Sequence, residues 1–146
     1  MDFFTRMEYN FESSTKIRVR YGETDQMGVA YYGNYAQFFE VGRVEALREI
    51  GMTYRSMEEK GVMLPVSEFY VKYIASAKYD DEITVVTAIT SVEGARIRFD
   101  YQLFNEYKKC LAKAHTVLVF VNKESMRPTA APKDFLSILE KYQIGP

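Results

Sequence analysis

The sequence predicts an α+β domain in which one long apolar helix is wrapped by a curved five-stranded antiparallel sheet, followed by a short C-terminal helix. Two patterns indicate this fold class. One segment carries apolar side chains at helical spacing over a very wide arc, whereas one segment before it and four after it read as strands. A helix whose apolar face is all but closed must be covered, and a single curved sheet provides that cover.

Length and composition are those of one folded domain. The chain has 146 residues, 47% of them hydrophobic and 27% charged, so disorder is excluded as the default. Its 19 basic and 20 acidic residues leave a formal charge of −1, and broad binding to nucleic acid or to an anionic membrane is therefore not expected. No segment approaches the roughly 20 apolar residues of a membrane span. Because the start also shows no signal peptide, we expect a cytoplasmic protein.

The first regular element is a strand over residues 15–21, where apolar and threonine side chains alternate with basic ones. Residues 1–14 show no clear period. We therefore expect them to form a loosely attached N-terminal extension to a single domain over residues 15–146. A turn bracketed by glycines follows over residues 22–28.

The long helix is predicted to begin after Asn34 and to end before Gly51, because the two residues suit an N-cap and a C-cap, respectively. A second, more polar segment over residues 53–61 is also expected to be helical. The apolar stripe of the long helix recurs at three- and four-residue spacing and consists of Tyr35, Phe38, Phe39, Gly42, Ala46 and Ile50.

Four strands are predicted after these helices, over residues 64–75, 82–91, 95–104 and 110–121. The breaks between them are short, which favours antiparallel connections. Pro132 then opens the short terminal helix. Five strands around one helix leave sheet edges and an outer sheet face exposed, so we expect the chain to pair with a copy of itself.

The densest chemical segment is RYGETDQMGVAYYGNY, residues 20–35. It places Asp25 in a glycine-bounded loop directly before the apolar helix. A helix N-terminus offers unpaired N–H groups and a partial positive charge, which suit an oxyanion or a polarised carbonyl. A carboxylate beside it can act as a nucleophile or as a general base on water. The segment predicts an acyl-transfer or hydrolysis site; the alternative is that Asp25 only stabilises the turn or caps the helix.

Few other residues offer reactive chemistry. The single cysteine, Cys110, shows no nucleophile motif, and the single histidine, His115, is best interpreted as a packed or partly exposed strand residue. One cysteine and one histidine leave no disulfide and no common metal motif, so no metal or cofactor is expected. Glu23 would raise the pKa of Asp25 if both carboxylates pointed inward, but the turn leaves this open.

The same segment resembles the hotdog-fold acyl-CoA thioesterases, and more narrowly the 4-hydroxybenzoyl-CoA thioesterase family with its Tol-Pal-associated acyl-CoA branch. The resemblance runs from about Thr15 to Tyr142. It is carried by D-x-x-G-V at residues 25–29, N-Y at residues 34–35, Phe38-Phe39-Glu40 with Arg43, the aromatic-Asp turn at residues 79–81, and Arg127-Pro128 with Pro132.

This resemblance implies a hotdog fold in which two subunits join their sheets into one continuous sheet, with the active sites at the dimer interface. We expect a homodimer, and dimers that pair into a homotetramer. The implied reaction is hydrolysis of an acyl-CoA substrate to a free acid and coenzyme A, without a cofactor. Asp25 would attack the thioester or activate water, the Tyr32 backbone N–H would polarise the thioester carbonyl, and Gly28 would let the loop approach the substrate.

The resemblance also suggests binding residues. Tyr31, Tyr35 and Val29 would line the acyl pocket, although ordinary packing of the helix start explains the tyrosines equally well. Arg96 and Arg98 are candidates for the phosphates of coenzyme A, with a solvated strand face as the alternative.

One feature leaves the acyl group of the substrate open, and another restricts the type of reaction. Many Tol-Pal-type members carry a histidine where this chain has Tyr32, so the preferred acyl group is not defined. The absence of a helix histidine argues against hydration or dehydration chemistry. Two other functions stay in view: hydrolysis of acyl groups from acyl carrier protein, and binding of acyl-CoA without catalysis.

Overall fold

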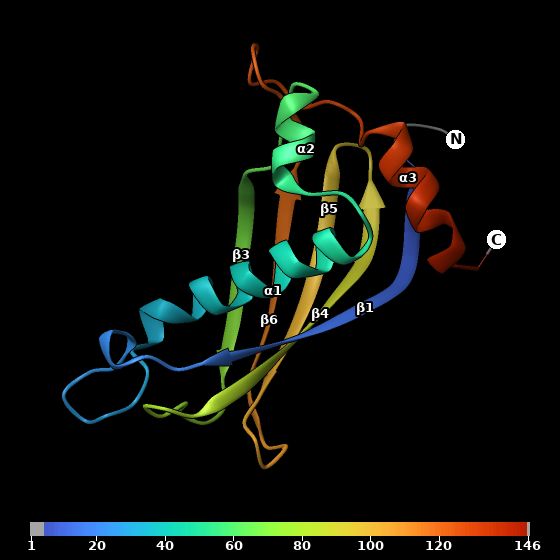
Figure 1. Ribbon diagram of the computed structural model, residues 1–146. Coiled ribbons are helices and arrows are strands. Elements are labelled where there is room, and N and C mark those ends of the chain that lie inside the picture. Colours follow the sequence, from blue (N-terminus) through green and yellow to red (C-terminus); the bar gives the residue numbers. More distant parts are fainter. Residues whose placement is uncertain (1–4, 146) are drawn as a thin grey trace.

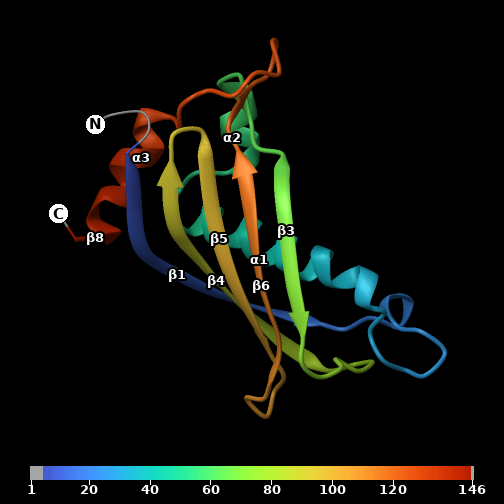
Figure 2. The same cartoon turned by 180° about the vertical axis from the view of Figure 1, so that it is seen from behind.

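The computed structural model describes residues 5–145 and confirms the α+β fold class. Within this range, six antiparallel strands form one sheet in the order β3-β6-β5-β4-β1-β8, and helix α1 (Tyr35–Glu49) lies across one face of the curved sheet (Figure 1). Seen from behind, the strands lie in front of α1 (Figure 2). The long strands are β1 (Arg6–Arg18), β3 (Val66–Tyr73), β4 (Glu82–Glu93), β5 (Arg96–Phe104) and β6 (Cys110–Val119).

The five predicted strands are these five, and the two-residue β8 (Gln143–Ile144) adds a sixth beside β1. The short predicted helices are present as α2 (Tyr54–Glu59) and α3 (Lys133–Leu139). The remaining elements are the 3-10 turns η1 (Tyr21–Glu23), η2 (Tyr32–Asn34) and η3 (Glu140–Tyr142), and the paired short strands β2 (Val62–Met63) and β7 (Val121–Asn122).

Strand β1 begins at Arg6, so the expectation of a loosely attached extension is wrong for residues 6–14. These residues pair with β4 and bury Tyr9 and Phe11 in the core. The pairing register shifts between Glu8 and Phe11, and a polar residue, Ser13, takes the next buried position. Only the second feature weakens the period of two in the sequence, because buried and exposed positions alternate without a break along the whole of β1. The first four residues of the expected extension lie outside the described range.

Helix α1 ends as its glycine predicts. Gly51 has a φ of 85°, its N–H donates to Arg48 O at 3.0 Å, and the Met52 N–H donates to Leu47 O at 2.9 Å. This pair of bonds is a Schellman motif, which needs a left-handed residue after the helix. The helix also begins as predicted, with Asn34 at the N-cap position, but the side chain of Asn34 makes no capping bond to the helix.

A polar network crosses the core beneath α1. Arg43 is buried, and its guanidinium donates from Nε to Tyr54 Oη at 2.6 Å and from Nη1 to Tyr101 Oη at 3.0 Å. Tyr101 Oη also lies 2.6 Å from Thr116 Oγ1. The network therefore joins α1, α2, β5 and β6 in one set of hydrogen bonds.

Strand β3 is exposed along one edge of the sheet. Within the described residues it pairs with β6 on one side and with no strand on the other. Helix α1 covers this edge poorly, as Phe69 shows: its ring packs against Phe39 yet stays 42% exposed. The exposed apolar side chains of this segment are Val66, Phe69, Tyr70, Tyr73 and Ile74.

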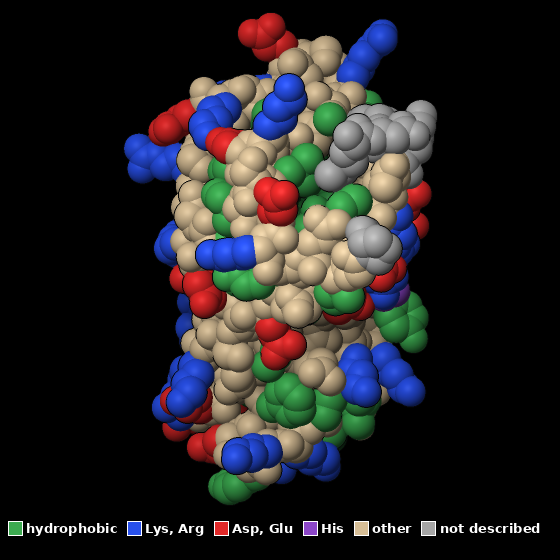
Figure 3. Space-filling model, turned by 90° about the vertical axis from the view of Figure 1, so that its right-hand side faces the viewer, with side chains coloured by type: hydrophobic (Ala, Val, Ile, Leu, Met, Phe, Trp, Pro, Cys, Tyr) green, Lys and Arg blue, Asp and Glu red, His purple; other side chains and the backbone are tan. Residues whose placement is uncertain are grey.

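The surface beside α3 carries Lys and Arg side chains interspersed with Asp and Glu, as the net charge of −1 suggests (Figure 3). That face offers no extended field of one sign to a polyanion. Among the helices of residues 5–145, none has the length and hydropathy needed to cross a membrane.

Gly42 marks the closest approach of α1 to the sheet. A Cβ placed there would lie 2.5 Å from Thr87 Oγ1 and 2.6 Å from Val85 Cγ1. Alanine favours a helix over glycine by about 1 kcal/mol, but overpacking of this kind costs about 1–3 kcal/mol. We therefore expect Gly42→Ala to lower the melting temperature by several degrees in differential scanning calorimetry.

Gly22→Ala is the matched control for this substitution, since no heavy atom lies within 4 Å of its Cβ position and its φ is ordinary. Its melting temperature should change by no more than about 1–2 °C. A Gly42→Ala protein that melts at or above the parent temperature would show that α1 can move away from β4 without loss.

Candidate active site

Asp25 lies in the loop between η1 and η2. This loop lies at one end of α1 (Figure 1). Its N–H donates to Val29 O at 2.9 Å, and the Gly28 N–H donates to Asp25 O at 3.1 Å. Gly28 has a φ of 76°, a conformation in which other side chains are strained, and its Cβ position is open. The left-handed conformation of this turn therefore accounts for a glycine at position 28.

The Asp25 carboxylate has one oxygen engaged in the loop. Oδ1 accepts the Met27 N–H at 2.8 Å, which is an Asx turn. This is the turn-stabilising role named above as the alternative to catalysis. Within residues 5–145, Oδ2 has no hydrogen-bond partner, and the side chain is exposed. The turn therefore fixes the carboxylate and leaves its second oxygen available.

A cavity of about 530 Å³ lies beside this carboxylate. Four residues predicted from the sequence line it together: Asp25, Val29, Tyr32 and Tyr35. Sequence reasoning missed the opposite wall, which comes from the end of β3 and the segment after it. The full lining is Asp25, Val29, Ala30, Tyr32, Tyr35, Tyr73, Ile74, Ala75 and Ser76.

The backbone of Tyr32 presents an available N–H at the start of α1. Tyr32 is the first residue of η2, and the first N–H groups of a helix lack intrahelical acceptors. Its carbonyl oxygen, in contrast, accepts the Tyr35 N–H and the hydroxyl of Tyr73, the latter at 3.1 Å. Within residues 5–145, the Tyr32 carbonyl oxygen thus accepts two hydrogen bonds, and the Tyr32 N–H has no acceptor.

Tyr31 does not join the cavity wall. It is 47% exposed, and its ring lies against that of Tyr32 with centroids 4.6 Å apart. Its N–H donates to Glu23 O at 2.9 Å. Of the two tyrosines predicted to bind the acyl group, Tyr35 lines the cavity and Tyr31 does not.

Two of the phenols that line the cavity, Tyr35 and Tyr73, have pKa values raised by burial. Burial raises the pKa of Tyr35 above its ordinary value. Burial, and then the neighbouring phenols of Tyr35 and Tyr32, raise the pKa of Tyr73. The Tyr35 hydroxyl accepts the Ala77 N–H at 3.2 Å, so it also ties the helix to the segment after β3.

Glu23 anchors the loop and does not approach Asp25 as a second carboxylate. Its side chain is buried and accepts the Arg20 N–H at 2.7 Å and the Arg20 guanidinium at 3.3 Å. Its carbonyl accepts both the Tyr31 N–H and the Asn34 side-chain amide, each at 2.9 Å. Asn34 therefore joins the helix start to the loop.

Arg96 and Arg98 lie on the face of the sheet opposite α1. Arg96 pairs with Glu68 at 2.9 Å, and Arg98 holds Asp100 through Nε at 3.1 Å and Nη2 at 3.0 Å. The two arginines line a second cavity, which shares no lining residue with the cavity beside Asp25. In the single chain, the predicted coenzyme A contacts are thus separate from the residues predicted around Asp25.

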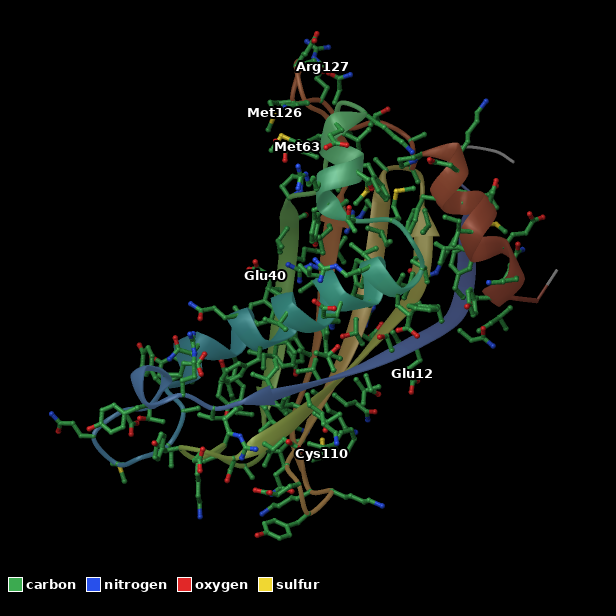
Figure 4. The ribbon with its side chains drawn as sticks, in the orientation of Figure 1. Glu12, Glu40, Met63, Cys110, Met126 and Arg127 are labelled. Carbon is green, nitrogen blue, oxygen red and sulfur yellow. The ribbon has the colours of Figure 1, made fainter. Side chains whose placement is uncertain are left out.

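The remaining candidates have packing roles. His115 stacks on Tyr70 with ring centroids 5.2 Å apart. Cys110 begins β6 at the end of the sheet farther from α2 and Met63 (Figure 4). Across residues 5–145, no group of three or more His, Cys, Asp or Glu side chains is arranged to hold a metal ion.

A curved sheet wrapped around one helix, with a carboxylate loop at the start of that helix, defines the hotdog-fold class of thioester hydrolases. Residues 19–139 match the family model of the thioesterase-like superfamily. The chain belongs to this superfamily.

Individual relatives agree with that assignment. The chain is 36% identical over 123 residues to YneP of Bacillus subtilis, provisionally assigned as an acyl-CoA thioesterase, covering 84% of this chain and 89% of YneP. It is 35% identical over 122 residues to the acyl-CoA thioesterase YbgC of Haemophilus influenzae, covering 83% of this chain and 89% of YbgC. The structure is similar to that of DHNA-CoA thioesterase from Staphylococcus aureus, with a TM-score of 0.85, 32% identity and 89% coverage of each chain.

Proposed function

We propose that this chain hydrolyses acyl-CoA thioesters to a free acid and coenzyme A. The observation that carries the proposal is the placement of the Asp25 carboxylate and the start of α1, with the Tyr32 N–H, around one cavity. A carboxylate supplies the nucleophile or base, and an unpaired amide at a helix start supplies oxyanion stabilisation. The relatives named as acyl-CoA thioesterases support the same reaction.

The chemistry needs no group beyond these two. Asp25 attacks the thioester carbonyl carbon and forms a mixed anhydride that water then hydrolyses, or it removes a proton from the water that attacks this carbon. In both routes the carbonyl oxygen gains negative charge and accepts the Tyr32 N–H. The C–S bond then breaks, and the thiolate of coenzyme A leaves and takes up a proton.

The substrate contacts follow from the cavity lining. Tyr35, Val29 and Ala30 offer apolar surface beside the carboxylate, and we assign them to the acyl group. From the sequence, we keep Tyr31 as a substrate contact and Arg96 and Arg98 as contacts to the phosphates of coenzyme A. Arginine is suited to phosphates, although both arginines already pair with carboxylates.

The direct test is release of thiol from a panel of short, long and aromatic acyl-CoAs. We expect turnover of at least one class, with the background from Cys110 removed by an enzyme-only control. An acyl carrier protein thioester is included as a separate substrate. If only the carrier-protein thioester is hydrolysed, the proposed substrate changes from acyl-CoA to acyl carrier protein. If no thioester is hydrolysed, the proposed function is overturned.

We further propose that the active form is a homodimer that pairs along β3. The unpaired edge of β3 and its half-exposed Phe69 and Tyr73 support this, because such an edge invites strand addition. The end of this strand also forms one wall of the cavity beside Asp25. A second subunit on β3 would then narrow that cavity and exclude water from it.

Phe69→Glu is expected to weaken dimer association by at least about tenfold, since a charge would be buried at the interface. Sedimentation equilibrium of the parent and the variant over a range of concentrations measures this. Tyr107→Glu is the control, because Tyr107 is 84% exposed at the β5–β6 hairpin, away from β3. A parent that sediments as a monomer, or a Phe69→Glu protein that associates as tightly as the parent, contradicts the β3 dimer.

A further inference from the structure

Tyr73 joins the exposed edge of the sheet to the start of α1. It is the last residue of β3, where it pairs with Ala112 of β6. Its hydroxyl donates to the carbonyl oxygen of Tyr32 at 3.1 Å. That oxygen already accepts the Tyr35 N–H, which closes the 3-10 turn. The bond from Tyr73 therefore adds a connection to the sheet that the turn itself does not require.

The ring of Tyr73 makes two further contacts with the helix start. It packs edge-on against the ring of Tyr35, with centroids 5.0 Å apart, and against that of Tyr32, with centroids 6.1 Å apart. Edge-to-face pairs of this kind are favourable and set the relative orientation of the rings. Tyr73 is thus fixed by the sheet on one side and by two aromatic contacts on the other.

Other hydrogen bonds at this site hold different groups. The Tyr31 N–H and the Asn34 side chain both donate to Glu23 O, and these bonds join the helix start to the Asp25 loop. Among residues 5–145, Tyr73 is the only side chain that forms a hydrogen bond with the Tyr32 backbone. The Tyr35 hydroxyl and the Ala30 N–H also join this segment to Ala77, but the Tyr73 bond holds the Tyr32 backbone itself.

We propose that Tyr73 is a positioning residue for thioester hydrolysis, which holds the Tyr32 carbonyl so that the Tyr32 N–H keeps its direction toward the reacting carbonyl. This inference rests on the proposed function. An amide that stabilises an oxyanion must be held in place before charge develops, because its contribution depends on geometry. A 3-10 turn at the start of a helix has poorer hydrogen-bond geometry than the helix itself, so an external bond there limits its movement.

Two kinetic properties distinguish this role from simple packing. Oxyanion stabilisation acts in the transition state, so its loss lowers kcat and leaves KM nearly unchanged. Burial and the neighbouring phenols raise the pKa of Tyr73, so its hydroxyl stays a donor from neutral to mildly alkaline pH. The effect of removing the hydroxyl should therefore be the same across this range. A proton-transferring tyrosine would instead change the pH profile of kcat.

The test compares Tyr73→Phe with Tyr70→Phe, each measured on the acyl-CoA that the parent hydrolyses best. Tyr70 lies three residues earlier in β3 and stacks on His115 on the other face of the sheet, so its substitution removes a phenol from the same strand without touching the helix start. We expect Tyr73→Phe to lower kcat about tenfold with KM within about twofold, and Tyr70→Phe to leave both at parent values. Equal kcat in Tyr73→Phe and the parent would overturn the inference.

Hydrogen exchange of the peptide segment that covers residues 31–37 provides a readout that does not depend on activity. We expect faster exchange in Tyr73→Phe than in the parent or in Tyr70→Phe, and equal exchange in all three would overturn the inference. A parent that hydrolyses no thioester overturns the proposed function and this inference together. A parent with full activity whose Tyr73→Phe variant keeps its kcat overturns this inference alone.

Discussion

Replacing Asp25 with asparagine is expected to reduce kcat for acyl-CoA hydrolysis by at least about a hundredfold, equivalent to about 2.7 kcal/mol of transition-state stabilisation. The substitution removes the charge that, in the proposed function, attacks the carbonyl or accepts the proton of water. It keeps a side-chain oxygen in the position of Oδ1, which accepts the Met27 N–H at 2.8 Å. The loop can therefore keep its shape while the chemistry is lost.

This design separates the proposed catalytic role of Asp25 from its role in the Asx turn. If the carboxylate served only the Asx turn, asparagine would replace it at little cost, because Asn forms the same turn. Asp25→Ala, in contrast, removes the turn bond as well as the charge. We expect Asp25→Asn to melt at the parent temperature and to lose turnover, and Asp25→Ala to show the same loss of turnover with a lower melting temperature.

Asp81→Asn is the matched control, because the Asp81 carboxylate also accepts a backbone N–H in a nearby turn, that of Lys78 at 2.9 Å. It should keep the parent kcat. Thiol release at saturating acyl-CoA measures all variants. Parent-like turnover in Asp25→Asn would refute the assignment of Asp25 and leave the Asx turn as its whole role.

The fold could be predicted from the sequence wherever a clear helical or strand period of apolar residues matched the side chains that are buried. The apolar arc that contains Phe38 and Phe39 predicted α1, and both residues are fully buried against the sheet. The prediction failed at the start of β1, where the apolar alternation is short and Ser13 takes the next buried position, and at β8, which is two residues long. No periodicity can be detected in two residues, and the partner of such a strand is decided by tertiary contacts.

The candidate site could be predicted only in part, for a similar reason. Asp25, Tyr32 and Tyr35 lie within one short segment, so their proximity follows from the local sequence alone. Tyr73 lies 41 residues after Tyr32, and its hydrogen bond to that residue depends on how β3 is placed against α1. In the sequence it is one of many residues of an alternating strand, and nothing local distinguishes it from Tyr70.

The second large effect is expected at Arg43. Arg43→Ala should lower the free energy of unfolding by about 3 kcal/mol or more, and the melting temperature by roughly 10 °C. The side chain is buried beneath α1 and donates to the hydroxyls of Tyr54 and Tyr101 at 2.6 and 3.0 Å. Alanine would leave both a cavity and two phenols without their donor.

Two opposing terms decide the sign of this effect. The phenols cannot act as counterions: burial raises the pKa of Tyr54 and of Tyr101 above the ordinary value, although the guanidinium lowers both. The cost of removing the guanidinium charge from water is therefore not repaid by a carboxylate within the network, and deleting a buried charge can relieve that cost. The volume of the side chain and its two hydrogen bonds act in the other direction, and we expect them to prevail.

Arg43→Met separates these terms, because methionine fills much of the same volume without charge or donors. We expect a smaller loss, on the order of 1 kcal/mol, since only the hydrogen bonds are removed. Urea unfolding followed by circular dichroism measures both variants, at one protein concentration because the proposed dimerisation would add to apparent stability. An Arg43→Met protein more stable than the parent would mean that desolvation of the guanidinium outweighs its hydrogen bonds, and the network would then weaken the fold.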